Sequence, residues 1–270
     1  MRQSDHRAIG VFDSGVGGLT VLKALMERLP QESTFYLGDT ARVPYGTKSA
    51  EVVTRYSLKN AEFLIGREIK LLVVACNTAS AAALPQLSRE LKVPVLGVIE
   101  PGAQAASTSS QSGHIGVIGT PATIRSGAYQ RALMEARPGV KVKAKACPLF
   151  VPLAEEGWVG GDVPRLVARE YLADFARNGV DTLVLGCTHY PLLKDVIADV
   201  VGDRVKLVDS ADATAAAAAS LLAGRGLLAP EGATAQHRYF VTDVPERFVE
   251  VGARFLGRHI DSAEQVDLTF

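Results

Sequence analysis

The chain has 270 residues, enough for one or two domains. Hydrophobic residues make up 47% and charged residues 21%, which is typical of a globular protein with a sizeable core and excludes a disordered chain. The 29 basic and 29 acidic side chains cancel, so the whole chain lacks the positive excess that binds nucleic acids or anionic membranes.

The strongly apolar runs, such as residues 71–76, are far shorter than the roughly 20 residues that span a bilayer. Residues 1–10 contain no apolar signal core. The three cysteines, Cys76, Cys147 and Cys187, are an odd number that suits a reducing compartment better than a disulfide scaffold. We therefore expect a cytoplasmic protein with no membrane or nucleic-acid partner.

Short β-branched runs alternate with longer amphipathic stretches along most of the chain. In chain order, we expect strands at 8–12, 34–37, 71–75, 95–98, 114–118, 141–146, 182–185 and 206–208. The helical patterns fall at 19–29, 50–67, 163–177 and 192–200, with an Ala-rich helix at 211–222. Continuous apolar strands joined by helices indicate mainly parallel sheets covered on both faces, so the predicted fold class is α/β.

A diverged internal repeat is visible. Residues 9–14 match 115–120, and residues 72–78 match 183–189, in the same order and at offsets of 106 (115 − 9) and 111 (187 − 76). The repeat predicts two related, pseudo-symmetric lobes. The segments at 98–102 and 208–210 look like crossings, so we expect a first lobe of residues 1–98 plus 210–270 and a second lobe of residues 99–209.

The two matched cysteines are the most informative residues. Cys76 and Cys187 each end an apolar strand and precede a helix, with Thr78 and Thr188 as suitable helix caps. Ligands of parallel α/β sheets bind at the carboxyl ends of strands, and a nearby helix N-terminus favours thiolate, lowering a pKa of about 8.5. One such cysteine is usually a small core residue, which is our interpretation of Cys147. Two at matched positions favour a thiolate and a thiol that face each other across a cleft between the lobes.

Other polar segments stay open between a structural and a functional interpretation. The glycine-rich turn at 13–18 could approach an anionic group closely or be a plain strand-to-helix turn, and it is not a P-loop. Asp13 could hold a proton donor or an ammonium group. Residues 39–46 have the composition of a surface turn, and His189 that of a helix-capping or core histidine. No CxxC and no spaced His pair predicts a metal site.

Five motifs, in order along the chain, together resemble the cofactor-independent aspartate/glutamate racemase family, and within it the enzymes that act on glutamate. They are residues 13–20 (DSGVGGLT), 38–42 (GDTAR), 44–46 (PYG), 75–79 (ACNTA) and 186–191 (GCTHYP). The resemblance implies two pseudo-symmetric lobes with the active site between them, no cofactor and no metal. It further implies glutamate as substrate, D-glutamate for peptidoglycan precursor synthesis as product, and a homodimer as an expected assembly.

By the same resemblance, Cys76 and Cys187 are the acid/base residues on opposite faces of the substrate. The first works on the D-enantiomer and the second on the L-enantiomer. Asp13 is implied to assist Cys76, and His189 to assist Cys187. Two thiols of similar intrinsic acidity suit a reaction that must run equally well in both directions.

A carboxylate is implied to support the second side, and Glu155 fits this role better than its neighbour Glu156. Without the resemblance, both would be expected to be solvated charges. The residues implied to bind the substrate are Asp13, Ser14, Tyr45, Gly46, Asn77, Thr78, Thr120, Thr188 and His189.

Three other functions remain open at this point. One is an aspartate racemase, or another two-cysteine isomerase with a different acid as substrate. Another is a cysteine hydrolase that uses Cys187 with His189, which needs no Cys76. The third is a two-lobed protein that binds an amino acid without chemistry.

Overall fold

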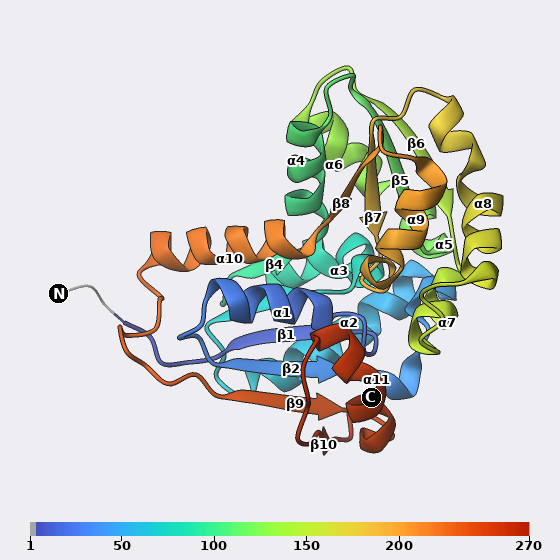
Figure 1. Ribbon diagram of the computed structural model, residues 1–270. Helices are drawn as coiled ribbons and strands as arrows, with labels where there is room; N and C mark the ends of the chain where they lie inside the picture. The colour runs from blue at the N-terminus through green and yellow to red at the C-terminus, as the bar shows by residue number, and fades with distance from the viewer. Residues whose placement is uncertain (1–3, 270) are drawn as a thin grey trace.

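The computed structural model describes residues 4–269, with the backbone alone at 176 and 177. Within these residues two parallel sheets form (Figure 1). The first has the order β10 (Glu264–Gln265), β9 (His237–Val241), β2 (Thr34–Gly38), β1 (Ile9–Asp13), β3 (Leu71–Val74), β4 (Val95–Gly97). The second has the order β6 (Lys141–Ala146), β5 (His114–Gly119), β7 (Thr182–Gly186), β8 (Lys206–Asp209).

Helices cover both faces of each sheet, because the apolar strands present side chains alternately to either side. On the first sheet, α1 (Leu19–Arg28), α10 (Ala211–Arg225) and α11 (Pro245–Leu256) share a core with one face, and α2 (Ala50–Ile65) and α3 (Asn77–Glu90) with the other. On the second, α4 (Ile99–Ser109) and α6 (Ala128–Ala136) cover one face, and α7 (Phe150–Glu155), α8 (Asp162–Arg177) and α9 (Lys194–Val201) the other. The α/β fold class is confirmed.

The internal repeat is visible in the strand register. In the first sheet β1 lies between β2 and β3, and in the second β5 lies between β6 and β7. Ile9 pairs with Leu71, and at the matching positions Ile115 pairs with Thr182. Matched strands therefore carry Cys76 and Cys187 to equivalent edges of two different sheets.

Two strands were not expected from the sequence. β9 and β10 extend the first sheet beyond β2 and come from the end of the chain. The expected helix at 192–200 begins instead as the short 3-10 helix η3 (Tyr190–Leu193) and continues as α9. The exact lobe boundaries at 98/99 and 209/210 stay a prediction. α10 packs along α1 and also contacts α4, so it touches helices of both sheets.

None of the helices formed by residues 4–269 has the length and apolar character needed to cross a membrane.

Candidate active site

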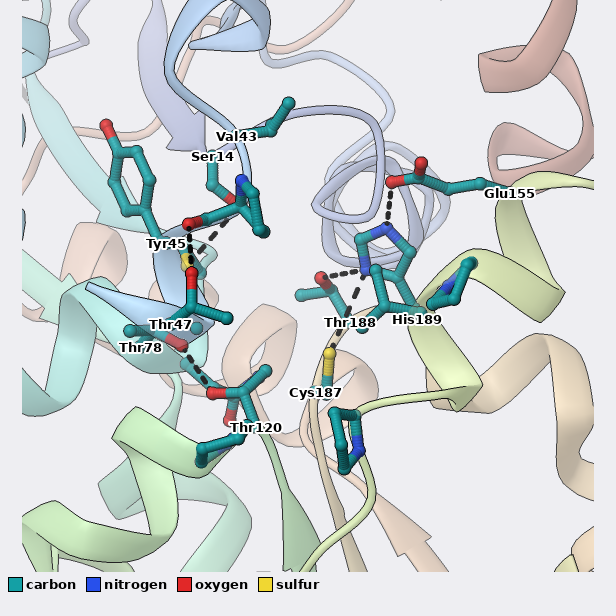
Figure 2. Close-up of a pocket in the computed structure, with 18 residues that line it drawn as sticks. Ser14, Val43, Tyr45, Thr47, Thr78, Thr120, Glu155, Cys187, Thr188 and His189 are labelled. Carbon is teal, nitrogen blue, oxygen red and sulfur yellow. Dashed lines mark hydrogen bonds and ion pairs between the residues drawn. The ribbon is translucent and has the colours of Figure 1, made fainter. Parts of the chain in front are cut away.

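A cavity of about 330 Å³ opens where the carboxyl ends of strands from both sheets meet (Figure 2). This volume is within the range of small-molecule sites. The expected site residues on its wall are Ser14, Tyr45, Gly46, Cys76, Asn77, Thr78, Thr120, Glu155, Cys187, Thr188 and His189. The remaining wall residues are Val43, Pro44, Thr47, Pro121, Pro148, Val151 and Pro152, which the sequence did not single out.

Cys76 follows β3 and itself caps α3. Its Sγ accepts a hydrogen bond from the backbone N–H of Ala79 at 3.5 Å and lies 3.8 Å from the Ser14 hydroxyl. The expectation that Thr78 caps this helix is wrong, since the helix already begins at Asn77. Burial raises the pKa of Cys76 to about 12, and the charge of Asp13 adds to the rise. The expectation of a lowered pKa is therefore wrong for this thiol, because loss of water outweighs the helix N-terminus.

Asp13 ends β1, is fully buried and does not line the cavity. Its Oδ2 accepts a hydrogen bond from the backbone N–H of Gly15 at 3.0 Å, whereas Oδ1 has no partner among the described residues. Burial raises the pKa of Asp13, against the opposing effects of His189 and of nearby backbone N–H groups. Asp13 thus lies behind the cavity wall, where it accepts a hydrogen bond and raises the pKa of Cys76 by its charge.

Cys187 follows β7 and faces a histidine held by a carboxylate. Its Sγ lies 3.8 Å from His189 Nδ1, and His189 Nε2 lies 2.9 Å from Glu155 Oε1. Figure 2 shows the three side chains in line, from the sulfur to the carboxylate. Burial alone would lower the pKa of His189, but its contacts with Cys187 and Glu155 prevail and raise it to about 10. The ring is thus a buried cation beside the sulfur, and its partners explain why that charge is tolerated.

The expected cap at Thr188 is also wrong, because η3 begins at Tyr190 and His189 occupies the capping position. Thr188 instead lies on the cavity wall, with its hydroxyl 3.5 Å from His189 Nδ1. His189 thus precedes η3 without a capping hydrogen bond from its side chain, and it lines the cavity.

The two neighbouring glutamates differ in their contacts. Glu155 binds His189, and the contact lowers the pKa of Glu155 although burial works against it. Glu156 is 64% exposed and lies 3.4 Å from Arg247. Geometry therefore singles out Glu155.

The helix α11 supports this pair from the first sheet. Arg254 donates a hydrogen bond to the backbone carbonyl of Glu155 at 2.9 Å. The ring of Phe255 packs edge-on against that of His189, with 5.1 Å between the ring centres. These contacts link the last helix of the chain to the candidate site of the second sheet, and nothing in the sequence pattern indicated them.

The rest of the wall is uncharged and largely apolar, and a group of threonine hydroxyls lies at one side of it. The hydroxyls of Thr78, Thr120 and Thr123 lie 2.9 to 3.0 Å from one another. Gly46 approaches this group so closely that a Cβ there would lie 2.6 Å from Thr120 Cβ. The loop of Gly46 and the start of α5 (Pro121–Ser126) therefore form one tightly packed wall.

Tyr45 lines the cavity, but its hydroxyl is bonded to residues outside the lining. That hydroxyl donates to Asp39 Oδ2 at 2.5 Å and accepts from Asn60 Nδ2 at 3.0 Å. The contribution of Tyr45 to the cavity is thus its ring and backbone. Residues 43–46 of the 39–46 segment, which had the composition of a surface turn, line the cavity.

Cys147 is fully buried in the core of the second sheet and does not line the cavity, so its structural interpretation fits its position. Across the described part of the chain, no group of three or more His, Cys, Asp or Glu side chains could hold a metal ion. The cavity wall described above contains no lysine.

Two buried thiols that follow matched strands line one cavity between the two parallel sheets of this α/β protein. Residues 9–218 match the Asp/Glu/Hydantoin racemase family. A glutamate racemase of Geobacter metallireducens is 60% identical over 97% of both chains, and one of Syntrophus aciditrophicus is 52% identical over 96% of both. The protein belongs to the Asp/Glu/Hydantoin racemase family and is an isomerase.

Solved structures of glutamate racemases are also similar to this chain. The chain is 42% identical to a glutamate racemase isoform of Bacillus anthracis, with a TM-score of 0.92 and 98% of both chains covered. A glutamate racemase of Francisella tularensis, solved in complex with D-glutamate, is also 42% identical, with a TM-score of 0.91 over 98% of both chains. An aspartate racemase of Picrophilus torridus is 19% identical with a TM-score of 0.54, which shows a shared fold alone.

Proposed function

We propose that this protein is a glutamate racemase that interconverts L- and D-glutamate, with Cys76 and Cys187 as acid and base. The observation that carries the proposal is the single cavity that both thiols line, each from a different sheet. Relatives up to 60% identical are glutamate racemases, and one structural neighbour binds D-glutamate. The 330 Å³ of the cavity suits a small amino acid.

In the L-to-D direction, the Cys187 thiolate takes the α-proton, and the C–H electron pair stays on the α-carbon. The Cys76 thiol then gives its proton to the opposite face of that carbon, which inverts the stereocentre. Afterwards Cys187 is a thiol and Cys76 a thiolate, which is the state that begins the D-to-L direction. The two directions are thus the same steps in reverse order.

The charges around the thiols favour one of these states in the free enzyme. With a pKa of about 12, Cys76 keeps its proton at neutral pH. The His189 cation, 3.8 Å from Cys187 Sγ, stabilises negative charge on that sulfur. These charges suit Cys187 as the base and Cys76 as the acid of the L-to-D direction. Asp13 opposes negative charge on Cys76, and so keeps this thiol protonated, in the form that donates a proton in the L-to-D direction.

Removal of an α-proton next to a carboxylate develops negative charge that must be stabilised. Donors for it are the side chains and backbone amides of Ser14, Asn77, Thr78, Thr120 and Thr188 on the wall. Gly46 brings its backbone close to Thr120. We infer that these groups hold the carboxylates of glutamate.

The proposal is tested with purified, reduced protein and L-glutamate in deuterated buffer, without added pyridoxal phosphate or metal. Circular dichroism follows the loss of optical activity, and proton NMR follows the loss of the α-proton signal. Decay of both signals is the expected result. Inversion of aspartate but not of glutamate overturns the substrate assignment, and tight glutamate binding without deuterium uptake overturns the enzymatic one.

Three further expectations depend on this proposal. D-glutamate formed here would feed peptidoglycan precursor synthesis, and the enzyme would work in the cytoplasm. A homodimer is supported by exposed apolar side chains on and near α7 and α8, such as Leu149, Trp158 and Leu166. Sedimentation velocity of the protein with and without glutamate tests the homodimer.

A further inference from the structure

A buried tyrosine in a helix that covers the second sheet contacts a cavity residue that belongs to the first sheet's side. Tyr129 of α6 is 1% exposed, and its hydroxyl donates a hydrogen bond to Asn77 Oδ1 at 2.6 Å. Asn77 is the first residue of α3 and lies on the cavity wall. Tyr129 itself does not line the cavity. Any effect of Tyr129 on a ligand would therefore pass through Asn77.

The other end of the Asn77 carboxamide has no partner. Its Nδ2 is buried and makes no hydrogen bond within the described residues. A carboxamide has one acceptor oxygen and two N–H donors, and a buried donor without a partner is costly. Because Asn77 lies on the cavity wall, a bound carboxylate can supply the acceptor.

The tyrosine could, in principle, hold the carboxamide in either orientation, because a phenol both donates and accepts hydrogen bonds. The contact in the structure is with the carbonyl end of the carboxamide: the Tyr129 hydroxyl donates to Asn77 Oδ1 at 2.6 Å, and Nδ2 faces away from the tyrosine. Ser210 also contacts the Tyr129 hydroxyl, and this contact partly offsets the rise that burial causes in the pKa of Tyr129. Burial raises the pKa of Tyr129 far above its usual range, so the phenolic proton stays in place.

Close packing holds this arrangement. A Cβ on Gly186, at the end of β7, would lie 2.9 Å from Tyr129 Cε2. A Cβ on Gly102, in α4, would lie 3.1 Å from Ser210 Cβ and 3.4 Å from the Tyr129 hydroxyl. The ring and the hydroxyl therefore have little room to move.

We propose that Tyr129, held by Ser210, is a positioning residue that orients the Asn77 carboxamide so that Nδ2 donates to a carboxylate of the substrate. This inference rests on the proposed function for the identity of the ligand. In this proposal, a helix that covers the second sheet takes part in substrate binding on the first sheet's side of the cavity.

The test compares Tyr129→Phe with the wild type in both directions of racemisation, with binding of D-glutamate measured by calorimetry. Loss of one hydrogen bond that orients a ligand donor is expected to weaken binding by about three- to ten-fold. The KM should rise by a similar factor in both directions while kcat changes little, because neither thiol is touched. Ser210→Ala should change KM in the same direction by a smaller factor.

A double-mutant cycle separates positioning from general damage. In an Asn77→Ala background, Tyr129→Phe should no longer weaken glutamate binding. Tyr171→Phe is the matched control, since its hydroxyl accepts from the Leu149 backbone away from the cavity and its loss should leave KM unchanged. Thermal unfolding verifies that each variant is folded.

Two outcomes overturn the inference: an unchanged glutamate affinity in folded Tyr129→Phe, or an equal loss of affinity with and without Asn77. A wild-type protein that neither binds nor racemises glutamate would instead overturn the proposed function.

Discussion

Thr78 and His189 occupy equivalent positions in the two halves of the molecule, each two residues after the cysteine that follows the matched strand. The thiols are therefore related by the repeat, but their partners are not. Thr78 bonds to the hydroxyls of Thr120 and Thr123, whereas His189 is a cation between Cys187 and Glu155. Asp13, the acid near Cys76, matches Gly119 in the second half. One thiol thus has an anion nearby and the other a cation.

Replacement of either wall cysteine should abolish inversion. Cys76→Ala and Cys187→Ala are each expected to lower the racemisation rate by about 10² to 10⁴-fold, the usual worth of a positioned acid or base. Cys147→Ala is the control, because Cys147 is buried outside the cavity. Polarimetry with both enantiomers measures the rates. Full activity in Cys76→Ala would favour the cysteine hydrolase or another one-thiol mechanism.

The Cys76 thiol should alkylate slowly, and Asp13→Asn should speed the reaction. At pH 8 a thiol with a pKa of about 12 is on the order of one part in 10⁴ thiolate. Removing the charge of Asp13 removes one cause of that high pKa, so the thiolate fraction rises. Iodoacetamide labelling of Cys76, followed by mass spectrometry between pH 7 and 10, gives the rate. An equal or slower rate in Asp13→Asn contradicts the electrostatic account.

The His189 cation should stabilise the fold below neutral pH and lose that effect in alkali. Its folded pKa of about 10 lies above the ordinary 6.5, so its contribution is complete below about pH 6.5 and disappears as the pH rises through about 10. Glu155→Gln removes one cause of the raised pKa, so this window should end at a lower pH. At pH 6 the Glu155→Gln substitution should lower the free energy of unfolding by about 1 kcal/mol.

Urea unfolding between pH 6 and 10 measures this effect, and Glu156→Gln is the matched control. Glu156 is exposed and contacts Arg247 rather than His189, so its replacement should change neither stability nor rate. Glu155→Gln should also slow L-to-D racemisation by about ten-fold, because the cation beside Cys187 is weakened. Equal effects of the two variants would show that the His189 contact is unimportant.

Gly17 should tolerate no side chain. A Cβ there would lie 2.3 Å from Thr188 Oγ1 and 2.4 Å from His189 Nδ1, so Gly17→Ala must displace the ring or the loop. Misplacement of about 1 Å can cost on the order of 10² in rate, and a fall of that size in kcat is expected. Gly160→Ala, with nothing within 4 Å of the new Cβ, should be silent. An active Gly17→Ala enzyme would show that His189 can shift without harm.

Much of the fold could be predicted because its inner strands are continuous apolar runs. The strand Leu71–Val74 is fully buried, and its pattern admits few alternatives. The strands β9 and β10 were missed because they begin with or consist of polar side chains: His237 and Arg238 open β9, and β10 is the pair Glu264–Gln265. Their place in the sheet depends on pairing of β9 with β2 and of β10 with β9, which local sequence does not encode.

The sequence pattern and residue type singled out Cys76, Cys187 and His189, and all three line the cavity; their roles stay a prediction. Local pattern could not show how burial would act on a single thiol, so the expected lowering of the Cys76 pKa was wrong. It also could not find Arg254 and Phe255, which contact Glu155 and His189 across a long separation in sequence. Contacts between distant segments are set by packing, and the local sequence does not predict them.

The order in which the chain leaves the ribosome differs from the order in which its sheets can be completed. All four strands of the second sheet lie between His114 and Asp209, so that sheet has every strand before the last 61 residues (270 − 209) are made. The first sheet is complete only after β9 and β10 have been made, and Glu155 gains its contact with Arg254 only after α11 has been made. Although domains generally fold from the N-terminus during synthesis, here the half that starts first is finished last. A nascent chain stalled before Pro245 would carry both wall cysteines and still lack the helix that supports His189.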